Sequence, residues 1–260
     1  MNASLVIQSD ALTDVGRKRS LNEDAVLNRP EIGVWAVADG MGGHGGGDVA
    51  SRAIVDGLSR IAPAVSASQL LDDFEARIAA AHEDLRALAR HEGRPVIGST
   101  LAALIIYEAN YACVWCGDSR VYRLRSGALA QLSHDHSEVQ DLVDRGVLEK
   151  AEAKSWPRAN VVTRAIGASE HPELEIVDGQ VAPGDRFLIC SDGLTAHVED
   201  DEIAAHLNGA DPRAVCQGLV ALTLERGARD NVSVVAVFCE ANTLTVRLDP
   251  AAARGYFTQT

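Results

Sequence analysis

Four short runs rich in apolar, β-branched and aromatic residues follow one another in the middle of the chain: STLAALIIYE (residues 99–108), YACVWCG (111–117), RVYRLR (120–125) and LAQLS (129–133). Asparagine, glycine, aspartate and serine residues separate them, as is typical of turns between strands. Strands joined by such short turns form a meander. The segment therefore argues against the regular strand–helix alternation of a doubly wound parallel sheet.

Helical periodicity appears on both sides of this meander. Before it, apolar side chains recur every three or four positions over residues 70–88, with Ser68 as the expected cap and Gly93 as the expected end. A shorter helix is expected over residues 49–61. After the meander, Asp211-Pro212 predicts a helix start, because proline is tolerated in the first turn.

Further strands are expected in the second half of the chain. Residues 137–155 are charged and weakly helical, and strand-like runs then return at NVVTRAIG (160–167), ELEIVDG (173–179), RFLICSDG (186–193) and NVSVVAVFC (231–239). Packing the amphipathic helices on the outer faces of two mainly antiparallel sheets buries both the strands and the apolar helix faces. The sequence therefore predicts the α+β class.

Composition and charge exclude several kinds of partner. The 260 residues are 47% hydrophobic and contain no proline-rich or serine-rich linker, which predicts one domain. A net charge of −13 repels nucleic acid, and no Lys/Arg-rich block offsets it. The longest apolar stretch is too short to span a bilayer, and the N-terminus lacks the features of a signal peptide. We therefore expect a cytoplasmic protein without a nucleic-acid or membrane partner.

The five cysteines do not suggest a disulfide framework, because their number is odd. Cys113-x-x-Cys116 resembles a redox or zinc pair. A strand, however, would point these two side chains to opposite faces, and the chain has no second ligand pair. We expect reduced, buried and inert thiols.

Acidic residues stand at the ends of the apolar runs. Five such places occur: Glu23-Asp24, Asp39, Asp118, Asp192 and Asp230. Strand ends are where a fold can bring distant side chains to one rim, and several carboxylates in a small volume cannot all stay ionised without cations. Oxygen ligands suit hard metals such as Mg²⁺ or Mn²⁺. The pattern predicts a metal site.

The stretch VADGMGGHGGG (residues 37–47) contains the letters of a dinucleotide fingerprint, Gly-x-Gly-x-x-Gly. That fingerprint needs a βαβ unit and an acidic residue about twenty positions on, and the nearest candidate, Asp56, lies inside an expected helix. The alternative is that the glycines serve Asp39. On this interpretation Gly40 allows a sharp turn and offers its carbonyl to a metal.

Eight motifs occur along the chain in this order: TDVGRKRSLNED (13–24), VADGMGGHGGGDVAS (37–51), GSTLAAL (98–104), GDSRVYRL (117–124), LSHDHS (132–137), VVTRAIG (161–167), LICSDGLTAHV (188–198) and ARDNVSVVAV (228–237). Together, and in this order, they resemble the PP2C, or PPM, family of metal-dependent protein serine/threonine phosphatases in its bacterial form. The resemblance covers about residues 5 to 240. It implies a four-layer αββα sandwich of two mainly antiparallel sheets flanked by helix pairs.

The resemblance also implies a binuclear Mn²⁺ or Mg²⁺ centre, with a third, weaker cation in bacterial members. Asp39 would bridge two cations, and the Gly40 carbonyl would join the second. Asp192 and Asp230 would hold the first cation. The remaining expected ligands are Glu23 and Asp24 near the second cation and Asp118 at the third.

The mechanism implied by the resemblance is direct in-line attack on phosphorus by a water shared between two cations, without a phosphoenzyme. Arg19 would grip the phosphate, because its planar fork suits two oxygens. His44 is the candidate general acid. The equal alternative is that His44 is a loop residue that hydrogen-bonds a water bound to the metal. The stretch from His134 to His136 is expected to be structural.

The expected organisation is a phosphatase domain over residues 1–240, with a flap at about 137–160, and a C-terminal extension over 241–260 that adds a strand or a docking element. The expected partners are phosphorylated proteins and a cognate Ser/Thr kinase, and the chain is expected to be a monomer. Similar proteins serve general kinase signalling or a dedicated system such as type VI secretion. The alternative function is a non-catalytic phosphoprotein-binding relative of the same fold.

Overall fold

The computed structural model describes residues 5–42, 46–153, 156–158 and 160–242. Its strands form two sheets in which every pairing is antiparallel. The first has the order β1 (Leu5–Asp14), β11 (Val232–Ala241), β10 (Asp185–Cys190), β7 (Arg120–Arg125), β8 (Ala128–Gln131). The second has the order β2 (Asp24–Arg29), β3 (Val34–Met41), β5 (Leu101–Tyr107), β6 (Asn110–Cys116), β9 (Glu175–Gln180), with β4 (Gly98–Ser99) paired to the end of β3.

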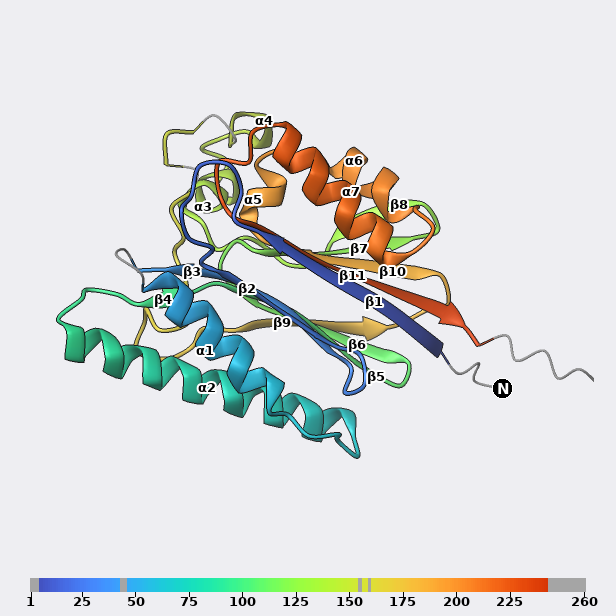
Figure 1. Ribbon diagram of the computed structural model, residues 1–260, viewed down its shortest axis with the longest axis horizontal. Coiled ribbons are helices and arrows are strands. Elements are labelled where there is room, and N and C mark those ends of the chain that lie inside the picture. Colours follow the sequence, from blue (N-terminus) through green and yellow to red (C-terminus); the bar gives the residue numbers. More distant parts are fainter. Residues whose placement is uncertain (1–4, 43–45, 154–155, 159, 243–260) are drawn as a thin grey trace, which may run out of the picture.

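Helices cover the outer face of each sheet (Figure 1). The second sheet is covered by α1 (Gly47–Ser59) and α2 (Ala67–Glu92), and the first by α5 (Asp192–Thr195), α6 (Asp200–Leu207) and α7 (Pro212–Glu225). Two short helices, α3 (Glu138–Asp144) and α4 (Lys150–Ala153), lie in the segment after β8. The α+β class and the four-layer αββα arrangement are confirmed.

Three apolar layers hold the sandwich together. Side chains such as Trp35 and Phe187 meet between the two sheets, and both are fully buried. Phe74 of α2 and Leu219 of α7 anchor the layers between each sheet and its helices. Alternation along the inner strands lets one strand supply two layers, because successive side chains point to opposite faces.

The cysteines illustrate this alternation. Cys113 belongs to the layer between the sheets, whereas Cys116 belongs to the layer beneath α1 and α2. All five thiols are free and buried, as expected. Burial raises the pKa of the Cys113 thiol to about 12, which keeps it protonated and unreactive.

Several sequence-based boundaries needed correction. The cap of α2 is Ser66 rather than Ser68, because the Ser66 hydroxyl accepts a hydrogen bond from the amide of Gln69. Gly93 ends this helix with a left-handed φ of 65°, as predicted. The first helix begins at Gly47 and ends at Ser59, two residues earlier at each end than expected. The helix start at Asp211-Pro212 is confirmed.

Residues 160–167 do not form the expected strand. Two isolated bridges pair this segment with the rest of the chain: Ser137 with Val162 and Ser99 with Ile166. The chain then turns away at Gly167, which has a φ of 91°. The segment therefore runs as irregular backbone along the end of the sandwich.

Within the residues that the structure describes, no helix combines the length and the apolar character needed to cross a membrane. The possible C-terminal strand falls almost entirely on residues 243–260, which lie outside the described residues. The extension, the boundary at residue 240 and the flap role of residues 137–160 stay predictions.

Candidate metal centre

The acidic residues at the strand ends meet at one pocket, as predicted. Glu23 directly precedes β2, Asp39 lies near the end of β3, Asp118 follows β6, Asp192 follows β10, and Asp230 precedes β11. All five line a cavity of about 370 Å³. Its other lining residues are Arg19, Gly40, Met41, Gly42, Thr100, Asn160 and Val162. The convergence follows from the antiparallel topology, which brings these strand ends to the same end of the sandwich.

Asp39 is fixed through its backbone. Its amide donates to the Thr100 hydroxyl at 3.1 Å, and its carbonyl accepts from the Thr100 amide at 2.8 Å and from the Ser99 hydroxyl at 2.9 Å. The Thr100 hydroxyl also shares a 2.8 Å hydrogen bond with the Ser119 hydroxyl, next to Asp118. Thr100 therefore ties two of the acidic positions together. No role was expected for Thr100 or Ser119 from the sequence, although they belong to the motifs at residues 98–104 and 117–124.

Burial and mutual repulsion oppose ionisation of these carboxyl groups. Burial, followed by the charges of Asp24 and Asp192, raises the pKa of Asp39 well above its usual range. Burial, followed by the charge of Asp192, does the same to the pKa of Asp118. The pKa of Asp192 is raised by burial and then by Asp230. A cation in the pocket would offset this repulsion and favour the ionised carboxylates.

Asp24 is placed differently from the other acidic residues. It lies opposite Asp39 in the β2–β3 pair, but it does not line the cavity. Its carboxylate accepts hydrogen bonds from the hydroxyls of Ser191 at 2.8 Å and Ser233 at 2.7 Å. Burial raises the pKa of Asp24 to about 7, although these two hydrogen bonds act against the rise. Asp24 thus lies behind the pocket wall, and its expected contact with the second cation stays a prediction.

Arg19 stands at the rim of the pocket beside Asp230. Its guanidinium donates to a carboxylate oxygen of Asp230 at 2.7 Å, and its side chain is 49% exposed. Asn231 organises this rim: its side chain accepts from the amide of Glu23 at 2.8 Å and donates to the carbonyls of Val15 and Leu21. This role of Asn231 was not expected from the sequence.

Gly40 does not lie in the sharp turn that was expected. It is part of β3 and pairs with Ser99 of β4. The absence of a side chain at Gly40 lets the backbone of Gly47 come close, since a Cβ at Gly40 would lie 1.9 Å from the carbonyl oxygen of Gly47. Gly47 in turn would place a Cβ 2.6 Å from the Gly40 carbonyl oxygen. The glycines therefore allow β3 and the start of α1 to touch.

The two histidine positions have different outcomes. His44 lies outside the described residues, so its expected roles stay predictions. The stretch from His134 to His136 makes structural contacts, as predicted. Nδ1 of His136 accepts from the amide of Gly117 at 3.1 Å, while Asp135 binds the guanidinium of Arg120 at 2.6 Å.

The donor set fits a hard divalent cation. Five acidic residues line one cavity, and oxygen is the ligand atom that Mg²⁺ and Mn²⁺ prefer. Among the described residues, no three His, Cys, Asp or Glu side chains are positioned to hold a metal ion as they stand. The Asp230 carboxylate, which lines the same cavity, accepts hydrogen bonds from the guanidinium of Arg19 and from the amide of Asn231.

Known proteins have a similar fold and a similar sequence. The family model described as Protein phosphatase 2C matches residues 16–216. The chain therefore belongs to the protein phosphatase 2C family, in agreement with the motifs. The serine/threonine protein phosphatase PstP of Mycobacterium tuberculosis is 35% identical over 89% of this chain. The chain spans only 45% of the length of that curated relative.

Two solved structures cover nearly the same length as this chain. PppA, described as a key regulatory component of the type VI secretion system in Pseudomonas aeruginosa, is 44% identical, with a TM-score of 0.84 over 91% of this chain and 99% of its own. The catalytic domain of PstP in complex with two manganese ions is 33% identical, with a TM-score of 0.83 over 91% of this chain and 99% of its own. These similarities establish the fold of this chain. They also show that a relative with the same fold binds two manganese ions.

Proposed function

We propose that this protein hydrolyses phosphoserine and phosphothreonine in proteins at a centre of two divalent cations, Mn²⁺ or Mg²⁺. The observation that carries the proposal is the convergence of Glu23, Asp39, Asp118, Asp192 and Asp230 on one cavity with Arg19 at its rim. Membership of the protein phosphatase 2C family and the similarity to a manganese-bound relative support it.

The acidic residues would hold the cations in this proposal. Asp39 would serve both cations, and Asp192 and Asp230 would bind the first. The Gly40 carbonyl would serve the second, with Glu23 and Asp24 acting near it directly or through waters. Asp118 would hold a third. Bound divalent cations supply an activated water for in-line attack on phosphorus and offset the charge of the phosphoryl oxygens.

Arg19 would orient the phosphate. Its guanidinium is half exposed at the pocket rim, and its hydrogen bond to Asp230 limits the positions that it can take. That hydrogen bond, followed in effect by the charge of Asp230, also raises the pKa of Arg19, so the group stays charged. A planar, charged fork can donate to two phosphoryl oxygens at once.

The alternative is a phosphoprotein-binding relative that lacks catalysis. Such a protein is expected to lose metal ligands, whereas every matched ligand residue is present in this sequence. Hydrolysis of p-nitrophenyl phosphate by the purified protein separates the two functions. We expect turnover with Mn²⁺ and its loss in EDTA. Absence of any metal-dependent turnover would overturn the proposed enzyme.

The physiological partners belong to the same proposal. Phosphorylated proteins are the substrates, and a bacterial Ser/Thr kinase would supply them. The 44% identity to PppA favours regulation of type VI secretion over general kinase signalling as the pathway to test first. Phosphoproteomes of cells with and without the protein should differ at components of that secretion apparatus. Changes spread evenly over unrelated proteins would favour general signalling.

A further inference from the structure

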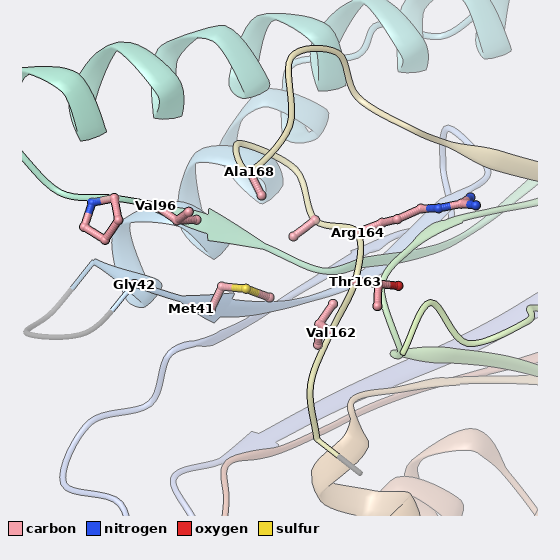
Figure 2. A pocket seen from close by; sticks show the side chains of 9 residues that line it. Met41, Gly42, Val96, Val162, Thr163, Arg164 and Ala168 are labelled. Carbon is pink, nitrogen blue, oxygen red and sulfur yellow. The ribbon is translucent and has the colours of Figure 1, made fainter. Parts of the chain in front are cut away.

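A second cavity, of about 510 Å³, lies beside the carboxylate pocket. Figure 2 shows side chains from three separate segments around it: the end of β3, the residues before β4, and the irregular segment after residue 160. Met41, Gly42 and Val162 line both cavities. The two cavities are therefore neighbours that share one wall, and we refer to the second as the apolar cavity.

The lining of this cavity differs chemically from that of its neighbour. Its side chains are mostly apolar: Met41, Pro95, Val96, Val162, Ala165 and Ala168. Pro95, Thr163 and Ala168 are exposed, so the cavity is open to solvent. An open apolar cavity of this size suits an aliphatic or aromatic side chain.

Among the described residues that line the cavity, Arg164 carries a charge, and two glutamates compensate this charge. The guanidinium donates to Glu175 at 2.7 Å and lies 3.4 Å from a carboxylate oxygen of Glu173. In Figure 2 the Arg164 side chain extends away from Met41 and Val96. The described lining of the cavity therefore offers no uncompensated positive charge to a second phosphate and favours an uncharged group.

The wall formed by residues 162–168 is held in place by contacts with the sandwich. The amides of Ser99 and Ile166 each donate to the carbonyl of the other residue, at 3.0 and 2.9 Å. The amide of Gly167 donates to Nδ1 of His82 at 3.0 Å. A preorganised wall lowers the cost of binding, because little of it has to be ordered.

We propose that the apolar cavity binds an apolar side chain of the protein substrate close to the phosphorylated residue, and thereby selects the sequence around it. The inference rests on the proposed function, since the substrate segment must pass the shared wall with its phosphate in the carboxylate pocket. The two cavities share a wall and an extended chain advances about 3.3–3.6 Å per residue, so we expect the selected side chain within about three positions of the phosphoresidue.

Matched phosphothreonine peptides test this inference. Each peptide carries leucine at one position from three residues before to three residues after the phosphothreonine, with serine elsewhere, and an all-serine peptide is the reference. We expect leucine at one position to raise kcat/KM by about tenfold, the size of effect that an apolar pocket gives. Equal kcat/KM for all peptides would overturn the selective cavity while leaving the phosphatase intact. Failure to hydrolyse any peptide and p-nitrophenyl phosphate would overturn both.

Filling the cavity supplies the second test. Ala168→Trp should reduce kcat/KM for the preferred leucine peptide to that of the all-serine peptide. It should leave hydrolysis of p-nitrophenyl phosphate, which has no flanking residue, unchanged. Ala109→Trp is the matched control, because Ala109 is an exposed alanine in the turn between β5 and β6, at the end of these strands away from Asp118.

Val96→Asp provides an independent variant, since it places a charge in the cavity from a different segment. Its expected effect is the same loss of preference for leucine. A leucine preference that survives both Ala168→Trp and Val96→Asp in folded protein would overturn the assignment. So would an equal loss of p-nitrophenyl phosphate hydrolysis, because that result would place the effect in the carboxylate pocket.

Discussion

The hydroxyl oxygens of Thr100 and Ser119 lie 2.8 Å apart in a buried hydrogen bond. Thr100 also accepts a hydrogen bond from the amide of Asp39, and Ser119 directly follows Asp118. This pair therefore couples the positions of two acidic residues that come from different strand ends. Groups of this kind orient the residues that bind a metal without binding it themselves.

The first prediction concerns this coupling. Thr100→Val keeps the shape of the side chain but removes both hydrogen bonds of its hydroxyl. We expect Mn²⁺ affinity, measured by calorimetric titration, to fall by about 10- to 100-fold. Thr100→Ser should restore most of the affinity, because it restores the hydroxyl. Wild-type Mn²⁺ affinity in the valine variant would show that the hydroxyl does not position the site.

The second prediction concerns the acidic residues themselves. Asp39→Asn and Asp192→Asn should each reduce metal-dependent hydrolysis by at least about 100-fold, because cations contribute several kcal/mol to transition-state stabilisation. The fold should persist, since each change removes a charge from a crowded, buried group. Circular dichroism and p-nitrophenyl phosphate kinetics measure the two effects. Near-normal turnover in either variant would mean that the site lies elsewhere.

The third prediction concerns Gly40. Gly40→Ala places a Cβ 1.9 Å from the carbonyl oxygen of Gly47, and backbone cannot yield as a flexible side chain can. We expect a loss of about 3 kcal/mol or more in the free energy of unfolding, or failure to fold. Gly57→Ala in α1 is the control. Outside its own helix, the nearest atom to the new Cβ would be the carbonyl oxygen of Arg77 at 3.7 Å, so we expect stabilisation by about 0.5–1 kcal/mol. Chemical denaturation compares them, and equal stability of the two variants would contradict the prediction.

The fourth prediction is a pH dependence at the surface. Glu202 of α6 accepts hydrogen bonds from Arg226, just beyond α7, and from the amide of Glu199, and these bonds lower its pKa to about 2. Because the pKa of Glu202 is lower in the folded protein than its ordinary value of 4.5, its ionised form stabilises the fold at pH values above 4.5. This stabilisation is lost as the pH falls toward 2. Glu202→Gln should therefore lower the Tm slightly at pH 7.

The difference in Tm between this variant and the wild type should shrink as the pH falls below 4.5. Added salt should also shrink it at pH 7, because exposed ion pairs are screened. Glu75→Gln on α2 is the control for net charge, because it removes the same negative charge from an exposed position. A difference that is constant from pH 7 to pH 2 would contradict the ionic origin.

The sequence by itself determined the antiparallel meander, the outer helices and the placement of acidic residues at strand ends. These are local properties: side-chain periodicity sets which face is buried, and turn residues set where a strand stops. Its ordered motifs also identified the family. The sequence placed the start of α2 at Ser68 instead of Ser66. The start is decided by which serine hydroxyl accepts a hydrogen bond from a free amide of the first helical turn, here that of Gln69.

Only the tertiary structure decided how the site is built. Asp24 lies behind the pocket because Ser191 and Ser233 donate to it, and those serines are 167 and 209 residues away in sequence. Gly40 has to be glycine because a Cβ there would meet the carbonyl oxygen of Gly47. The segment expected as a strand instead supplies Val162, Thr163, Arg164 and Ala165 to the lining of the apolar cavity. Such contacts join residues from separate helices, strands and loops, so they exist only once these elements have packed together.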